Sequence, residues 1–246
     1  MDKMLYIAAS GASQNMYALG VHANNLANAR TDGFKADLHQ ARSMQAFGEG
    51  LPTRVFAMNE RPASNFDAGS LKTTGRSLDV AIKGEGWFVV EDEQGNEALT
   101  RAGSLKIDEG GMLTNAQGRP IMGAAGPIFL PLPVEKVEIA TNGIITVRPQ
   151  GAPANAMEEV DQLQMVNPPI NTLTKGEDGL FRAFGGEAYL PDAEVELVAG
   201  AVEGSNVSPV HELVGMIEMQ RQFDMQLKMM KTAEENDRSA AKLLRV

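Results

Sequence analysis

Side chains that could perform metal chemistry are few and widely separated in this sequence. The three histidines, His22, His39 and His211, have no metal-ligating neighbour three or four residues away. Isolated histidines of this kind are more often core or surface residues than ligands. The chain has no cysteine, which excludes disulfides, a thiol nucleophile and cysteine-based zinc sites. We therefore expect no metal site and no cofactor.

Acidic residues in the middle of the chain allow a catalytic hypothesis, but a weak one. Asp79, Glu85 and Asp92 could supply the paired carboxylates of a glycosidase. The simpler interpretation is that they are solvated residues at strand ends, since no second feature distinguishes them. Gly84 and Gly86 lack the third glycine and the following helix of a dinucleotide-binding loop, so they indicate a turn. We predict that the chain is not an enzyme.

The clearest pattern is an apolar repeat of about seven residues near both ends of the chain, and it is typical of helices that pack lengthwise against other helices. At the start, it consists of Leu5, Ala12, Leu19 and Leu26 with Ala9, Met16 and Ala23 interleaved. At the end, it consists of Leu213, Met216, Phe223, Leu227, Met230, Ala241 and Leu244. The methionines around it suit adaptable packing better than metal binding. Termini with this pattern indicate helices through which the chain associates with partners.

Charge is distributed unevenly along the 246 residues. Of the net charge of −10, residues 1–35 contribute +1 and residues 209–246 contribute zero, so the middle carries −11. Near-neutral ends can crowd together at low electrostatic cost, whereas an acidic middle stays solvated. Nothing in this distribution resembles a basic nucleic-acid-binding surface.

No targeting or membrane segment is apparent. The start, Met1–Tyr6, lacks the basic region, the long apolar region and the cleavage site of a signal peptide. No stretch approaches eighteen apolar residues, so we expect no transmembrane helix. A protein of this kind that works outside the cytoplasm needs an export route without a cleaved signal.

The expected fold is α+β, with long N- and C-terminal helices packed as a coiled-coil-like domain and an antiparallel all-β domain inserted between them. The first helix should run from Asp2 to Asn28. The second should begin at Ser208-Pro209, an N-cap followed by proline at the first helical position, and end at Leu244. Strand periodicity begins at Leu78, and Asn142-Gly143 predicts a hairpin. These patterns predict a helical domain (1–35 and 208–246), an irregular connecting segment (36–75) and a β-rich domain (76–207).

Three separated motifs resemble those of bacterial flagellar rod and hook proteins. The first is Ala-Asn-Asn-Leu-Ala-Asn-x-x-Thr-x-Gly-Phe-Lys, from Ala23 to Lys35. The second includes Gly86-Trp87-Phe88 and Thr100-Arg101-x-Gly103, and the third begins at Glu203-Gly204-Ser205-Asn206-Val207. The order of the motifs matches that family over nearly the whole chain. The signature residues are Asn24, Asn25, Leu26, Ala27, Asn28, Thr31, Gly33, Phe34, Lys35, Gly204, Ser205, Asn206 and Val207.

The resemblance implies a structural subunit of the flagellar rod, the drive shaft that transmits torque from motor to hook. Chain length excludes the hook protein and the small rod subunits. Trp87 then favours the proximal over the distal of the two larger rod subunits, and the distal one is the alternative. The implied partners are further copies of the chain, the small proximal rod proteins, the distal rod protein and the flagellar type III export apparatus. The implied location is the periplasmic rod of the basal body, reached without a cleaved signal peptide.

Terminal helices of this family form the inner part of a tube, so we expect the apolar repeats to supply the contacts. Packing within one subunit and packing between subunits are both open, and we expect a mixture. The candidate assembly residues are Leu5, Ala9, Ala12, Met16, Leu19, Ala23, Leu26, Leu213, Met216, Phe223, Leu227, Met230 and Leu244. A more distant alternative is a secreted adhesin or effector with coiled-coil termini.

Overall fold

The computed structural model describes residues 4–45, 55–59, 63–153, 156–185 and 189–243. Its contacts divide the chain into two compact units. The helical unit comprises residues 1–29, 36–65 and 207–246, and the β unit comprises residues 30–35 and 66–206. The inserted antiparallel β region and the two packed terminal helices confirm the predicted fold class.

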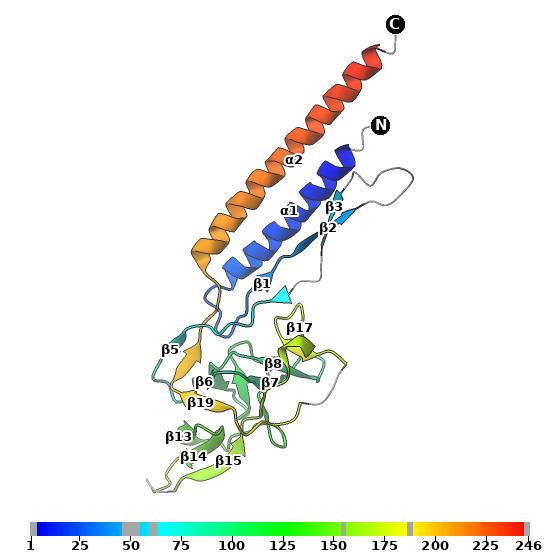
Figure 1. Cartoon of the computed structure of the whole chain (residues 1–246). Coiled ribbons are helices and arrows are strands. Elements are labelled where there is room, and N and C mark those ends of the chain that lie inside the picture. The colour runs from blue at the N-terminus through cyan, green and yellow to red at the C-terminus, as the bar shows by residue number, and fades with distance from the viewer. Residues whose placement is uncertain (1–3, 46–54, 60–62, 154–155, 186–188, 244–246) are drawn as a thin grey trace. The chain divides into compact units, whose positions relative to one another are not determined.

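Two long antiparallel helices form the core of the helical unit (Figure 1). Helix α1 spans Met4–Ala27 and helix α2 spans Pro209–Leu243, so α2 begins at the predicted proline. The first bond of α2 runs from the Glu212 N–H to the Ser208 carbonyl, which closes the first helical turn. Helix α1 ends one residue before the predicted Asn28, and the predicted ends Asp2 and Leu244 lie outside the described residues.

The segment expected to be irregular contributes strands to both units. In the helical unit, β1 (Asp37–Leu38) pairs with β4 (Ala63–Ser64), and β2 (Ala41–Gln45) pairs with β3 (Val55–Asn59). In the β unit, β5 (Leu71–Thr73) pairs with β20 (Ala201–Glu203). Strands of two or three residues, such as β1, β4 and β5, have too few alternating positions for the sequence pattern to reveal them.

The β unit contains an antiparallel five-stranded sheet, ordered β16-β7-β8-β18-β17. Its strands are β7 (Trp87–Glu91), β8 (Glu97–Thr100), β16 (Met165–Val166), β17 (Leu173–Lys175) and β18 (Phe181–Ala183). A single 3₁₀ turn, Ile170–Thr172, leads into β17. The other strands are β6 (Val80–Lys83), β9 (Leu105–Ile107), β10 (Leu113–Asn115), β11 (Met122–Gly123), β12 (Gly126–Pro127), β13 (Val134–Ile139), β14 (Ile144–Pro149), β15 (Glu158–Gln162) and β19 (Glu196–Ala199).

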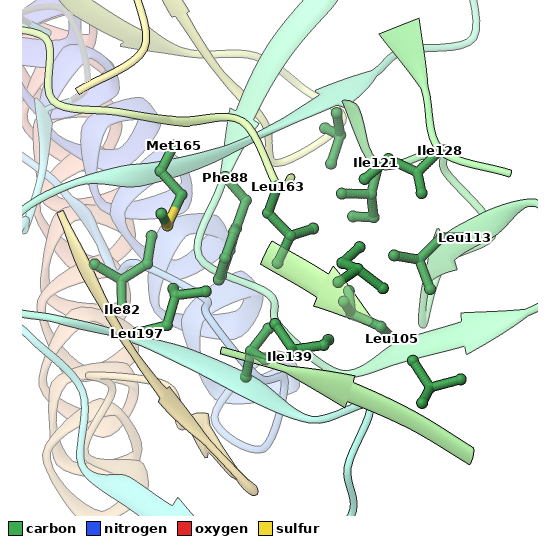
Figure 2. Packing of buried hydrophobic residues seen from close by; sticks show 14 of the residues in the cluster. Ile82, Phe88, Leu105, Leu113, Ile121, Ile128, Ile139, Leu163, Met165 and Leu197 are labelled. Carbon is green, nitrogen blue, oxygen red and sulfur yellow. The ribbon is translucent and has the colours of Figure 1, made fainter. Parts of the chain in front are cut away.

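Alternation along β7 divides the buried side chains of the β unit into two clusters. Phe88 and Val90 belong to the larger cluster, which packs with Ile82, Leu105 and Leu113 (Figure 2). Trp87 and Val89 face the other side of the strand and belong to a smaller cluster with Phe181. Because successive strand residues point to opposite faces, four consecutive buried residues here cover both sides of one sheet.

The hairpin predicted at Asn142-Gly143 is present between β13 and β14. Gly143 has a φ of 85°, and its N–H donates to the Ala140 carbonyl at 2.9 Å. The Asn142 side-chain oxygen accepts from the N–H of Ile144 at 3.2 Å. Glycine therefore supplies the left-handed conformation that closes this turn.

Gly103 should be intolerant of even a single added methyl group. A Cβ built at this position would lie 1.7 Å from the Val80 carbonyl oxygen, so a backbone must move in Gly103→Ala. We expect a loss of at least about 1–3 kcal/mol in the free energy of unfolding, measured by chemical denaturation. Gly110→Ala is the control, because its nearest new contact is an Asp108 side-chain oxygen at 3.2 Å. Equal stability of the two variants would contradict the packing described for Gly103.

Candidate functional site

Helix α1 meets α2 through small residues. A Cβ at Gly11 would lie 2.8 Å from the Gln226 side chain, and a Cβ at Gly215 would lie 2.8 Å from the His22 ring. Ala8, Ala12 and Ala18 of α1 are buried. At Gly11 and Gly215 the missing side chain leaves room for the Gln226 side chain and the His22 ring of the opposite helix. These contacts also show that the N-terminal end of α1 lies toward the C-terminal end of α2 (Figure 1).

A polar contact joins the two helices near the start of α2. The Glu212 carboxylate lies 2.6 Å from Nδ1 of His22, and the Glu212 side chain is buried. Glu212 also lies in the first turn of α2, where a negative charge is favoured by the helix dipole. The pair therefore specifies which turn of α1 faces the beginning of α2.

Asparagines of the family signature fasten the end of α1. Asn25 is buried, and its amide exchanges two hydrogen bonds of 2.9 Å with the backbone of Asp37. Asn28 donates to the carbonyl of Asn24 at 3.0 Å. The polar groups at this helix end thus provide both a link to the following strand and local capping.

The predicted assembly residues divide into covered and exposed groups in the structure. Ala12 is buried, and Leu19, Leu26, Met216, Phe223 and Met230 are half-buried. Leu5, Ala9, Met16, Ala23, Leu213 and Leu227 are exposed, and Leu244 lies outside the described residues. The positions that contact across the helix pair include Gly11, His22, Gly215 and Gln226, none of which belongs to the predicted apolar set. Part of the predicted set therefore remains available for contacts with other molecules.

The carboxylates considered for catalysis have structural roles or stand apart. Asp79 accepts from the Ser104 hydroxyl and lies 3.4 Å from the Arg76 guanidinium. Asp92 accepts from two backbone N–H groups and from Arg182, whose hydrogen bond and charge hold the Asp92 pKa at about 2. Glu85 is exposed. Asp79 and Asp92 are therefore buried structural residues and not the solvated strand-end residues that the sequence suggested, whereas Glu85 is exposed as expected.

Histidines do not assemble into a metal site in the described part of the chain. Among the described residues, no group of three or more histidine or acidic side chains is arranged to hold a metal ion. The His39 ring lies 5.8 Å from the Tyr17 ring, and burial together with the nearby His22 lowers the pKa of His39. His211 is exposed at the start of α2.

A buried ionic cluster in the β unit, which we call the clamp, consists of Lys35, Arg101 and Glu203. Glu203 accepts from Lys35 Nζ at 2.7 Å through one carboxylate oxygen and from Arg101 at 3.0 Å through the other. The N–H of Gly69 donates to the same carboxylate at 2.9 Å. All three charged side chains of the clamp are at most 7% exposed. Glu203 is thus the acceptor shared by both cations.

Further donors of the clamp also find partners, except Arg101 Nε, which is buried with no hydrogen-bond partner among the described residues. Lys35 Nζ donates to the Asp67 carbonyl at 2.8 Å, and Arg101 donates to the Gly84 carbonyl at 2.8 Å. The Arg101 guanidinium also lies 5.3 Å from the centre of the Trp87 ring. Burial lowers the pKa values of both Lys35 and Arg101, and the Glu203 carboxylate opposes that effect. The cluster is therefore stable only as a complete set, because each ion is removed from water.

Backbone contacts place the clamp where the chain enters and leaves the β unit. The N–H of Gly33 donates to the Glu203 carbonyl at 2.7 Å, and the N–H of Asn206 donates to the Phe34 carbonyl at 3.3 Å. Lys175 Nζ lies 3.9 Å from the centre of the Phe34 ring. The two outer motifs found in the sequence, around Lys35 and around Glu203, therefore meet in space.

Sequence reasoning did not assign a role to Glu203 or Arg101. Both residues occur in the motifs, but a charged residue in a motif is usually solvated, and nothing in its spacing shows burial. The available signal was that Lys35, Arg101 and Glu203 all fall inside separate matched motifs. The sequence alone did not show that those motifs lie close together in space.

Comparison with known protein families identifies three matching regions. Residues 5–35 match the model for flagella basal body rod proteins, and residues 198–243 match the C-terminal region of flagellar basal body rod FlgEFG proteins. Residues 81–147 match the D1 domain of flagellar hook protein FlgE/F/G. The two terminal matches contain nearly all of α1 and the whole of α2, together with Lys35 and Glu203 of the clamp.

Similarity to curated proteins extends over the whole chain. The flagellar basal-body rod protein FlgF of Escherichia coli K12 is 37% identical over 99% of both chains. FlgF of Salmonella typhimurium has the same identity and coverage. The chain belongs to the FlgF family of flagellar basal-body rod proteins. FlgG of Buchnera aphidicola subsp. Acyrthosiphon pisum is 30% identical over 96% of this chain. The FlgF family is structural and not enzymatic, which confirms the predicted class of function.

The helices of the described chain were also compared with the requirements of a membrane span. Neither α1 nor α2 has the combination of length and apolarity that a membrane span requires. The resemblance to rod proteins inferred from the three sequence motifs is confirmed by these comparisons. As a rod protein of this family, the chain is a component of the flagellar basal body.

Removing the shared acceptor of the clamp should destabilise the β unit strongly. Glu203→Ala leaves Lys35 and Arg101 buried without their counter-ion, and we expect a loss of about 3–5 kcal/mol in the free energy of unfolding. The matched control is Glu196→Ala on the neighbouring strand β19, where the pair with Lys83 is exposed and should contribute little. Urea denaturation monitored by Trp87 fluorescence measures both. Similar losses for the two variants would show that the clamp is not a special source of stability.

Proposed function

We propose that this chain polymerises through its terminal helices into the proximal part of the flagellar rod, the drive shaft that transmits torque from motor to hook. The supporting observation is the composition of α1. From Met4 to Ala29 the chain has no Asp, Glu, Lys or Arg, yet one side of α1 is exposed. A helix without charges on any face is typical of a helix that is surrounded by protein.

Large apolar side chains on the exposed sides of both helices support the same proposal. On α1 these are Leu5, Tyr6, Met16 and Tyr17, and on α2 they include Leu213 and Leu227. Scattered exposed apolar residues are normal on a monomer, but contiguous sets on helices mark interaction surfaces. Contacts between different surfaces of successive subunits generate open assemblies, as a rod requires.

The partners in this proposal are further copies of the chain, the small proximal rod proteins and the distal rod protein. Export without a cleaved signal peptide, through the flagellar export apparatus, would bring the subunit to the periplasmic rod. The residues assigned to assembly are the exposed and half-buried members of the predicted set, and the helical segments 1–35 and 208–246 carry them. Residues 36–75, which contribute strands to both units, connect them to the β-rich outer domain, 76–207.

Two alternatives have different consequences for the same chain. A distal rod protein would occupy the part of the rod next to the hook. The observation behind this alternative is the 30% identity to a FlgG. A secreted adhesin with coiled-coil ends would instead form a stable helical oligomer in dilute solution. The rod proposal expects a mostly monomeric protein before assembly.

The direct test is to delete the gene, isolate hook–basal bodies and examine them by electron microscopy. Mass spectrometry of wild-type particles should detect the chain, and the deletion should stop assembly at a partial rod without a hook. The length of the partial rod would distinguish a proximal from a distal position. Complete basal bodies in the deletion strain would refute the rod proposal.

A charge in the helical seam should block assembly without unfolding the β unit. Leu19→Asp places a carboxylate at a half-buried position of α1, and burying it without a partner costs several kcal/mol. We expect loss of motility on soft agar and loss of the chain from basal bodies. Asn236→Asp is the control, because it adds the same charge at an exposed position of α2. A motile Leu19→Asp strain would contradict the assignment of this seam.

A further inference from the structure

Helix α2 has a second apolar surface on the side turned away from α1. This surface, the outer ridge, consists of Val210, Leu213, Val214 and Ile217, whose exposed fractions range from 48% to 71%. At about 100° of rotation per residue, the four residues point roughly half a turn away from the α1-facing positions Glu212 and Gly215. The outer ridge therefore cannot be covered by α1 of the same chain.

The outer ridge is confined to the first turns of α2. The next residues on the same side are Arg221, Asp224 and Lys228, which are charged and exposed, with one exposed apolar residue, Met225, among them. An apolar surface that ends at a charged stretch is suited to a partner of limited length. The ridge spans eight residues, about 10 Å of helix rise.

Helix α1 has an exposed surface at the level of the outer ridge. The contacts of Gly11 with Gln226 and of His22 with Gly215 fix the antiparallel register. Continuing this register places residues 20–27 of α1 level with residues 210–217 of α2. The exposed residues in that stretch are Gly20, Ala23, Asn24 and Ala27, and they include no charge.

Gly20 is the most informative of these residues. It lies inside a helix, where glycine is unfavourable, and its φ is not in the left-handed region. Among the described residues, no atom lies within 4 Å of the position that a Cβ at Gly20 would occupy. Packing within the described chain therefore does not require a glycine here, whereas the close approach of another helix would.

We infer that the outer ridge of one copy packs against the Gly20–Ala27 surface of α1 in a second copy. The inference rests on the proposed assembly into a rod and names the surfaces that carry it. A second copy is the occupant because the chain itself contains both halves of the contact, a large apolar ridge and a small uncharged surface at the same level. The contact within one chain already shows the same principle, with the Gln226 side chain over Gly11 and the His22 ring over Gly215.

Such a contact joins unlike surfaces, so it leaves one ridge and one small surface unused at the ends of any row of copies. Heterologous contacts of this type extend an assembly instead of closing it as a dimer. Each α1 then lies between its own α2 and the α2 of another copy. The contact therefore extends the helix pair into a row of alternating α1 and α2 helices.

Photo-crosslinking in assembled basal bodies tests the contact. A photoreactive amino acid replaces Ile217 on the ridge, and in the control it replaces exposed Glu218, which points about 100° away on the same turn. Helix α1 lies within one tryptic peptide, Met4–Arg30, so mass spectrometry can identify it as the target. We expect a product of twice the chain mass that links residue 217 to this peptide, at least tenfold more abundant than in the control.

The outcomes separate the contact from the proposed function. If the chain is present in basal bodies but residue 217 links to another protein, to another region of the chain or to nothing, the contact is wrong and the rod function stands. If the wild-type chain is absent from basal bodies, the rod function fails and the inference fails with it.

Substitution of Gly20 gives a second, independent readout. Gly20→Leu meets open space in the described chain, so the purified variant should keep at least the wild-type helix content by circular dichroism. It should nevertheless enter basal bodies at least tenfold less than the wild type, because leucine fills the surface that the ridge needs. Gly20→Ala is the matched variant and should retain more incorporation. Wild-type incorporation of Gly20→Leu would overturn the inference.

Discussion

The hydrogen-bonded carboxylate of Glu203 is the interaction on which the closure of the β unit depends. One oxygen accepts from Lys35 and the Gly69 N–H, and the other accepts from Arg101. These donors come from the segment that follows α1, from the segment before β5 and from the end of β8. Removing three charges from water is costly, and apolar replacements of similar volume are often equally stable. The ions instead specify how the three segments are arranged, because only one arrangement brings all of these donors to the Glu203 carboxylate.

That geometry explains why the outer sequence motifs are far apart in the chain yet act together. Gly33 must approach closely, since a Cβ there would lie 2.3 Å from the Ala102 nitrogen, and its φ of 71° suits glycine. Gly69 is restricted in the same way, because a Cβ added there would lie 1.9 Å from the Gly204 carbonyl oxygen. The glycines permit the crossing of backbones, and the clamp fixes their register. The motifs around Lys35 and Glu203 are thus two halves of one structural feature.

Long-range periodicity and local turn chemistry were the parts of the fold that the sequence predicted well. The heptads located both helices, Ser208-Pro209 located the start of α2, and Asn142-Gly143 located a hairpin. Strand β15 has no apolar alternation that would predict it, because Glu158–Gln162 is largely acidic and polar and lies at the edge of a three-stranded sheet, where little burial is needed. The face of α1 toward α2 was also not resolved, because alanines and glycines cover several sides of this helix. The clamp was missed because burial of a charge depends on partners that are distant in sequence.

A subunit built in this way must keep its apolar surfaces exposed until partners are available. The small residues of α1 reduce that hazard, because alanine and glycine expose less apolar area than leucine would at the same positions. On α2, four of the exposed large apolar residues form the outer ridge, which occupies only about 10 Å of helix. The acidic middle of the chain, with a net charge of −11, adds repulsion between free copies. Association is therefore favoured where helix faces fit closely and disfavoured elsewhere, which is the balance that an ordered polymer of identical chains requires.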